Sequence, residues 1–261
     1  MVNTGILSSV SDRVGIIALD RPEVLNAIDR GMRLRLHDLV DEMDRDDGVG
    51  AIVITGQGSR AFCVGGNLNE MREIGPAEAE EIIVSFGRLY KRIRRTGKPI
   101  VAAVNGIAVG AGFQLAMLAD IRIGHPGVRL GQPEINAGMP TALGPYLMTS
   151  IVGRARAMEL TLTGRLVDAP ESELLGLLHR LVKEEDVLSE ARKIARDMAS
   201  KPPGALALQK QHFADASEAE FDMAIAAGRT LMRQAYKTGE PQAMIGKTLR
   251  KTKPAASEKL D

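Results

Sequence analysis

The sequence is poor in aromatic residues and in cysteine. It contains no tryptophan, three tyrosines and five phenylalanines, and Cys63 is its one cysteine. So few aromatic rings argue against a surface on which single-stranded nucleic acid stacks, and a single cysteine excludes an internal disulfide. The sequence also lacks an excess of either charge, because 34 basic and 33 acidic side chains give a formal net charge of +1. Since no strong field of one sign attracts nucleic acid or a membrane surface, we expect neither as a partner.

Long apolar runs are missing as well. None approaches the roughly 20 residues that a membrane-spanning helix needs. Residues 1–15 show no basic region followed by an apolar core, so they do not read as a signal or transit peptide. The four histidines are scattered without the spacing of metal ligands, and we expect no metal site. These absences favour a cytoplasmic protein.

What remains is the pattern of an α/β protein. With 261 residues, of which 44% are apolar, the chain can form one large domain or a domain with a helical appendage. Short apolar runs bounded by turn residues predict strands at 6–10, 14–19, 51–55, 100–104 and 121–124. Helical spacing of apolar residues predicts helices from Asp29, as N-cap, to Gly48, at 76–95 and at 110–119. This alternation indicates βαβ units and a mainly parallel sheet covered by helices.

The C-terminal part follows a different pattern. Asp168 and Glu171 resemble a capping box that opens a helix, and from about residue 186 the strand signals stop. A break at 201–204 divides the helices that follow. We therefore predict an α/β core over 1–195 and a helical region over 196–261, which packs on the core or on a neighbouring subunit.

Three segments carry candidate chemistry. Residues 61–71 contain the pair Gly65-Gly66, and residues 105–114 form a glycine-rich turn that opens a helix. Both can present backbone N–H groups to a ligand, although on spacing alone a glycine pair is more often a plain tight turn. A dinucleotide-binding fingerprint is excluded in the second segment, because Leu115 stands where its last glycine is needed. The third segment, 129–140, holds a lone carboxylate, Glu134, which taken alone is more often a solvated loop residue or a helix cap than a catalyst.

Taken together, these segments resemble the enoyl-CoA hydratase/isomerase (crotonase) family. Residues 21–28 resemble the family's first CoA-contacting loop, 61–71 and 105–114 its two oxyanion segments, and 131–138 its catalytic-acid segment. The likeness keeps its order and spacing over roughly residues 14–210. It implies a spiral of ββα units with a C-terminal helical oligomerisation region, hence a homotrimer or a hexamer. It also implies an acyl-CoA substrate and no separate cofactor, since CoA is part of the substrate.

The resemblance assigns roles to individual positions. The N–H groups of Gly66 and Ala111 are expected to polarise the thioester carbonyl, with Glu134 as acid and base. The remaining expected contacts with the substrate are Val24, Asn26, Ala27, Ala61, Cys63, Val64, Asn67, Leu68, Met139 and Pro140.

One position departs from the family's pattern. The typical hydratase has a second glutamate where this chain has Gln114. Glutamine can hold a water molecule but cannot take its proton. For Glu134 to act near neutral pH, burial should raise its pKa, and we expect Pro133, Ile135 and Met139 to supply the apolar surroundings.

Three functions follow from this sequence. Addition of water to a 2-enoyl-CoA is the first, because hydration is the family's commonest activity. Isomerisation of a 3-enoyl-CoA is the second, since one carboxylate is sufficient for it. The third is a protein that binds acyl-CoA without turnover, an interpretation motivated by Gln114.

Overall fold

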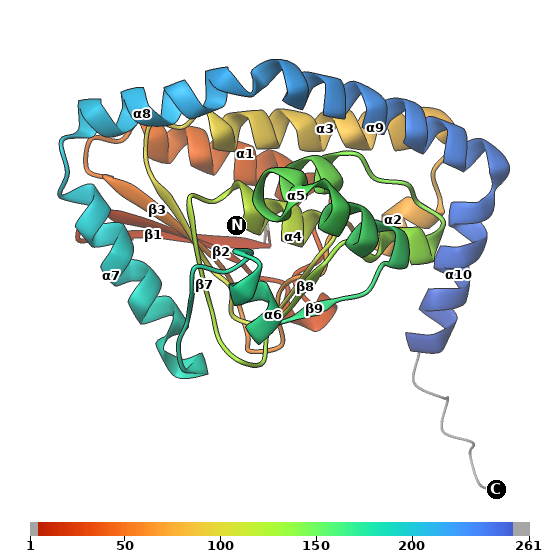
Figure 1. Cartoon of the computed structure of the whole chain (residues 1–261), viewed down its shortest axis with the longest axis horizontal. Helices are drawn as coiled ribbons and strands as arrows, with labels where there is room; N and C mark the ends of the chain where they lie inside the picture. The colour runs from red at the N-terminus through yellow and green to blue at the C-terminus, as the bar shows by residue number, and fades with distance from the viewer. Residues whose placement is uncertain (1–4, 253–261) are drawn as a thin grey trace, which may run out of the picture.

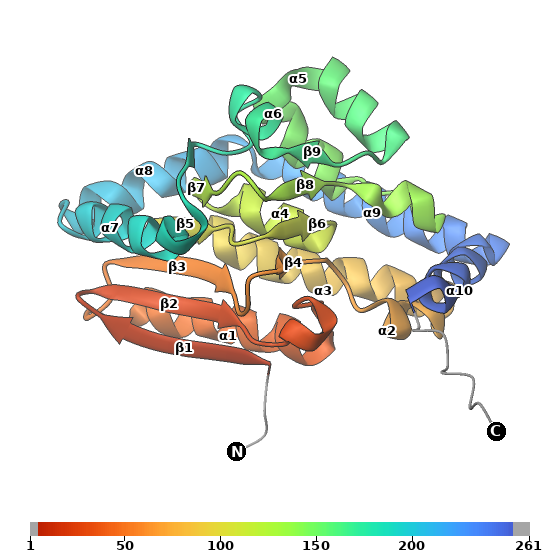
Figure 2. The ribbon, with the colours of Figure 1, turned by 90° about the horizontal axis from the view of Figure 1, so that it is seen from below.

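Two β-sheets form the centre of the molecule (Figures 1 and 2). The computed structural model describes residues 5–252. The larger sheet has the order β1-β2-β3-β5-β7-β10, in which β1 and β2 are antiparallel and the other pairs are parallel. Its strands are β1 (Ile6–Ser11), β2 (Val14–Leu19), β3 (Ala51–Gly56), β5 (Ile100–Ala103), β7 (Ile121–Gly124) and β10 (Arg180–Leu181). All five predicted strands are therefore confirmed.

The smaller sheet consists of short strands that the sequence pattern did not predict. They are β4 (Ala61–Cys63), β6 (Ile107–Val109), β8 (Arg129–Gly131) and β9 (Val167–Asp168), in that order. The strands β3, β5 and β7 of the larger sheet are followed in the chain by β4, β6 and β8 of the smaller one, and helices come next. This repetition confirms the expected spiral of ββα units.

Helices cover both faces of the larger sheet, which explains why β3 and β5 are buried along their whole length. On one face, α1 (Arg30–Arg45) and α3 (Pro76–Arg94) bury their apolar stripes in the main core. On the other face, α7 (Val187–Ala199) packs small residues against β3, β5 and β7. Asp29 caps α1 as predicted, its side chain accepting from the Met32 N–H at 2.9 Å. The predicted end at Gly48 is wrong, because Asp46 is already extended.

The C-terminal helices α8 (Pro203–Ala216), α9 (Glu218–Thr238) and α10 (Glu240–Thr252) pack on the core of the same chain. Helix α9 runs along α3 (Figure 1), and ion pairs such as Lys91–Asp222 and Arg94–Glu218 join the two. Helix α10 contacts α2 (Leu68–Arg72) and the 3₁₀ helix η2 (Pro133–Ala137). The division of the chain at residue 195 stays a prediction, and α7 extends across it.

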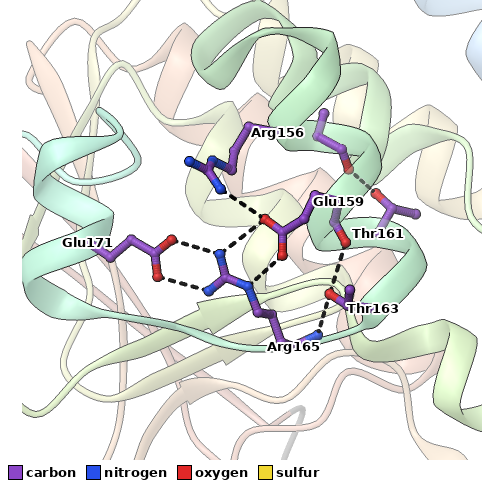
Figure 3. A network of polar contacts seen from close by, with 7 residues as sticks. Arg156, Glu159, Thr161, Thr163, Arg165 and Glu171 are labelled. Carbon is purple, nitrogen blue, oxygen red and sulfur yellow. Dashed lines mark hydrogen bonds and ion pairs between the residues drawn. The ribbon is translucent and has the colours of Figure 1, made fainter.

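A helix pair outside the spiral was only half predicted. Helix α5 (Leu143–Thr163) had no counterpart in the sequence pattern, and it is interrupted at Gly153, where φ is 75°. Helix α6 (Ala169–Leu174) begins as predicted, with Asp168 accepting from the Glu171 N–H at 3.0 Å. The reciprocal bond of a capping box is absent among the described residues, because the Glu171 carboxylate binds Arg165 instead. Arg165 also binds Glu159, and thus ties the end of α5 to α6 (Figure 3).

Within residues 5–252, no helix combines the length and the apolar character needed to cross a membrane.

Candidate active site

A cavity of about 830 Å³ opens where the smaller sheet meets α2, α3, α9 and α10. The loops that follow β4, β6 and β8 all reach it, so the three candidate segments of the sequence come together at one place. Its wall is apolar over most of its area, and Glu134 supplies the carboxylate nearest to the backbone of these loops.

Two unpaired backbone donors face this cavity. Gly66 lies between β4 and α2, and Ala111 begins α4 (Ala111–Leu118); both line the wall. Within the described part of the chain, neither N–H donates a hydrogen bond. The two loops touch, since a side chain at Gly65, which has a φ of +92°, would come within 3.2 Å of the Ala111 nitrogen. Two donors without a partner among residues 5–252 are thus held close together at the cavity wall.

The Glu134 carboxylate lies beside the second of these loops. A Cβ atom on Gly110 would lie 3.1 Å from Glu134 Oε1. The residue as a whole is partly exposed, but its Oε2 atom is enclosed and has no hydrogen-bond partner among residues 5–252. Burial raises the pKa of Glu134 from 4.5 to about 7, because a carboxylate loses solvation in such a place. Near neutral pH the group can therefore either accept or donate a proton.

The apolar surroundings of Glu134 differ from the expected ones. Pro133 and Met139 line the cavity, as expected. Ile135 is 41% exposed and points away from it, because residues 133–137 form a 3₁₀ helix that turns successive side chains in different directions. Tyr90 of α3 is fully buried nearby and donates to the Ala111 carbonyl at 3.5 Å. Burial raises the pKa of the Tyr90 hydroxyl well above its usual value, so this hydroxyl stays neutral.

Gln114 stands in the cavity wall on α4. Its Nε2 atom donates to the Oε1 atom of Gln132 at 3.1 Å. The side chain is 7% exposed, so its orientation is fixed by this bond and by packing.

Most of the predicted substrate contacts line the cavity: Val24, Ala27, Val64, Asn67, Leu68, Met139 and Pro140, together with Gly66, Ala111, Gln114 and Glu134. Asn26, Ala61 and Cys63 do not line it. The Asn26 amide is fully buried and donates to the carbonyls of Gln57 and Ala61. Burial raises the pKa of the Cys63 thiol to about 12, so the thiol stays protonated at neutral pH. These three residues are buried behind the cavity wall and support its loops.

The wall of the cavity that the helices form was not predicted from the sequence. Ile82, Ile83 and Phe86 belong to the helix predicted at 76–95, and they line the cavity together with Gly228 and Met232 of α9. Thr248 and Leu249 of α10 also belong to the wall, as do the half-buried Arg21 and the exposed Arg60. A glycine in the middle of a long helical pattern is unfavourable, so Gly228 was an available signal in the sequence.

A spiral of ββα units, with backbone donors and a buried glutamate at the ends of its short strands, defines a protein of the crotonase type. Comparison with known proteins agrees with this class. The model of the enoyl-CoA hydratase/isomerase family matches residues 9–255, and the chain belongs to that family.

Individual relatives cover nearly the whole chain. A probable enoyl-CoA hydratase of Mycobacterium tuberculosis is 34% identical over 250 residues, 95% of this chain and 96% of that protein. A crotonyl-CoA hydratase of Syntrophomonas wolfei is 30% identical over 226 residues, 86% of this chain and 87% of that protein. The crystal structure of an enoyl-CoA hydratase/isomerase from Xanthobacter autotrophicus superimposes with a TM-score of 0.86 at 27% identity, covering 94% of this chain and 93% of that one.

Proposed function

We propose that this enzyme adds water to a 2-enoyl-CoA thioester. The observation that carries the proposal is the pairing, in one apolar cavity, of two unpaired N–H groups with a buried carboxylate whose pKa is about 7. The names of the relatives agree, since proteins 30–34% identical over most of the chain are described as hydratases.

The reaction uses the site as follows. The thioester oxygen accepts hydrogen bonds from the Gly66 and Ala111 N–H groups. The ionised Glu134 takes a proton from water as the water oxygen bonds to C3, and electrons move through C2 onto the thioester oxygen. Glu134 then delivers that proton to C2, so that one molecule of water is added and the carboxylate is restored. CoA is part of the substrate, and we propose that no further cofactor takes part.

The backbone donors supply the main electrostatic stabilisation in this scheme. Negative charge develops on the thioester oxygen in the transition state, and a fixed donor in a site without bulk water stabilises it by about 3 kcal/mol. The first turn of α4 begins at Ala111, and the positive end of its dipole acts on the same charge.

A second function, conversion of a 3-enoyl-CoA to a 2-enoyl-CoA, is favoured by one specific observation. Gln114 replaces the second carboxylate of the typical hydratase, and among residues 5–252 it is the Glu134 carboxylate that lies beside the loop of Gly110 and Ala111. Isomerisation needs a single group, which removes a proton from C2 and returns it to C4.

Turnover of matched substrates separates these functions. The protein is incubated with 2-enoyl- and 3-enoyl-CoA esters of several chain lengths, and products are resolved by chromatography and mass spectrometry. We expect a gain of one water on 2-enoyl-CoA that disappears in Glu134→Gln. Conversion of 3-enoyl-CoA without water uptake would establish the isomerase instead. Tight binding of the esters without any reaction would establish a binding protein.

A further inference from the structure

A buried amide next to Glu134 takes no part in the scheme above. Gln132 lies between β8 and η2 and is 1% exposed. Its Nε2 atom donates to the Gly110 carbonyl at 3.0 Å, and its Oε1 atom accepts from Gln114 Nε2 at 3.1 Å. The amide lies so close to Gly144 that any side chain at that position would overlap it. The Gln132 side chain is thus fixed by hydrogen bonds at both polar atoms of its amide and by close packing against Gly144.

The acceptor of this amide belongs to the peptide unit that carries one of the proposed donors. The Gly110 carbonyl and the Ala111 N–H are parts of the same planar group and point in opposite directions. The carbonyl also accepts from the Gln114 backbone N–H at 2.9 Å. Gly110 has φ 57° and ψ −128°, a conformation that L-residues rarely adopt. Hydrogen bonds to the carbonyl therefore fix the direction in which the Ala111 N–H points.

The same contacts determine the orientation of the two side-chain amides, that is, where each places its nitrogen and its oxygen. A backbone carbonyl only accepts, so Gln132 must turn its NH₂ group toward Gly110 and its oxygen toward Gln114. Gln114 must then present its own NH₂ group to Gln132. The Oε1 atom of Gln114 accepts no bond from the described residues and is not among their fully enclosed polar atoms. The cavity is consequently left with an acceptor oxygen at this position.

We propose that Gln132 is a positioning residue that aims the Ala111 N–H at the substrate carbonyl and turns the Gln114 oxygen into the cavity. The inference rests on the proposed function in that Ala111 is taken as a carbonyl donor. It adds a preference: a group that donates a hydrogen bond, such as a water molecule or a 3-hydroxyl, binds beside Gln114, and a group that only accepts does not.

The test removes the amide while keeping the length of the side chain. Gln132→Met has neither donor nor acceptor, whereas Gln132→Glu can donate to Gly110 only when its carboxyl is protonated. The probe is a push–pull cinnamoyl-CoA, whose absorption moves to longer wavelength when a hydrogen-bond donor polarises its thioester carbonyl. Turnover of a 2-enoyl-CoA is measured in parallel.

We expect Gln132→Met to lower kcat about tenfold to hundredfold, as for a misdirected carbonyl donor, with KM within about threefold, and to lose the red shift of the bound probe. In Gln132→Glu we expect the red shift at pH 6 and its loss at pH 9, while the wild type, in which Glu134 also ionises over this range, keeps a red shift at both pH values. A purely structural role would not produce a shift that returns on protonation. If Gln132→Met does not fold, the pH dependence of Gln132→Glu decides alone.

The outcomes separate this inference from the assigned reaction. A hydratase whose red shift is unchanged in both variants would overturn the role of Gln132 and leave the reaction standing. A protein that polarises the probe through Gln132 but hydrates no enoyl-CoA would overturn the reaction and leave the role standing. A wild type that binds the probe without any shift would overturn both.

Discussion

Glu134 combines catalytic potential with a cost in stability, and both follow from its burial. Hydration begins with the ionised carboxylate, and burial raises the pKa of this group to about 7. We therefore expect kcat/KM for a 2-enoyl-CoA to be level above pH 7 and to fall about tenfold per pH unit below it, since the base is then protonated. A pH–rate profile from pH 5 to 9 measures this. A profile that stays level through pH 6 would contradict the assignment of Glu134 as base.

The same burial predicts a pH-dependent change in stability. The pKa of Glu134 is raised from 4.5 to about 7 on folding, so the protonated carboxyl is favoured in the folded state. Its contribution is fully present below pH 4.5 and is lost as the pH rises through 7. Relative to wild type, Glu134→Gln should gain up to about 3 kcal/mol in the free energy of unfolding at pH 8, and almost nothing at pH 4.5. Urea denaturation at both pH values checks this, and an equal difference at the two would contradict it.

Whether a single residue could be predicted from the sequence depends on whether its backbone or its side chain has the functional role. Gly66, Ala111 and Glu134 were found from the glycine pattern and the family resemblance, and all three line the cavity. The link from Gln132 to Gly110 was not predictable, because it joins residues 22 apart through one buried amide. Asn26 shows the opposite case: a residue in a recognisable loop whose side chain supports that loop instead of lining the cavity.

At the scale of elements, the long strands and capped helices could be read from the sequence, and the smaller sheet could not. Strands β4, β6 and β8 have three residues each, too few to show a periodic pattern. They are nevertheless the elements that place the three loops of the cavity wall. Helical periodicity likewise showed which face of α3 is apolar, but not that residues of this face line the cavity together with residues of α9.

The part of the cavity wall that α3 and α9 form together predicts how the acyl chain is selected. Gly228 lies on α9 at the cavity wall, and a Cβ at this position would come within 3.3 Å of Ile83 and 3.7 Å of Ala142. We expect Gly228→Val to narrow the cavity beside α9. Long 2-enoyl-CoA esters should then lose about tenfold to a hundredfold in kcat/KM relative to crotonyl-CoA, because each displaced group costs about 1–3 kcal/mol.

A matched variant controls for the effect on the helix itself. Gly246 lies on α10, with no atom within 4 Å of a Cβ at that position. Gly246→Val should leave the ratio of long-chain to short-chain activity unchanged. If both variants keep the wild-type ratio, the acyl chain does not pass between α3 and α9.

At the scale of the whole molecule, the helix pair α5 and α6 outside the spiral carries exposed apolar side chains. Met158, Leu162 and Leu166, at the end of α5 and just after it, are 49%, 67% and 39% exposed, and Leu174 of α6 is 87% exposed. The Arg165 network holds this helix pair together (Figure 3). Exposed apolar surface of this kind marks sites of association, which supports the homotrimer or hexamer that the family resemblance implies.

Sedimentation or light scattering tests the assembly. We expect a mass of roughly three or six times the 28.0 kDa protomer at micromolar concentration. Leu162→Glu should shift the mass toward the monomer, because it places a charge in the apolar surface. Leu34→Glu, at an exposed position on α1, is the matched control and should keep the wild-type mass. A monomeric wild type would contradict the prediction.

The two proposed donors belong to the main chain, and this has an evolutionary consequence. Every residue except proline carries a backbone N–H, so mutations around the cavity can accumulate while the pair at Gly66 and Ala111 persists. After gene duplication, one copy could acquire substitutions in the cavity wall while its two backbone donors stay in place. The positions on α3 and α9 are Ile82, Ile83, Gly228 and Met232. The reaction can thereby be inherited unchanged while the substrate diverges.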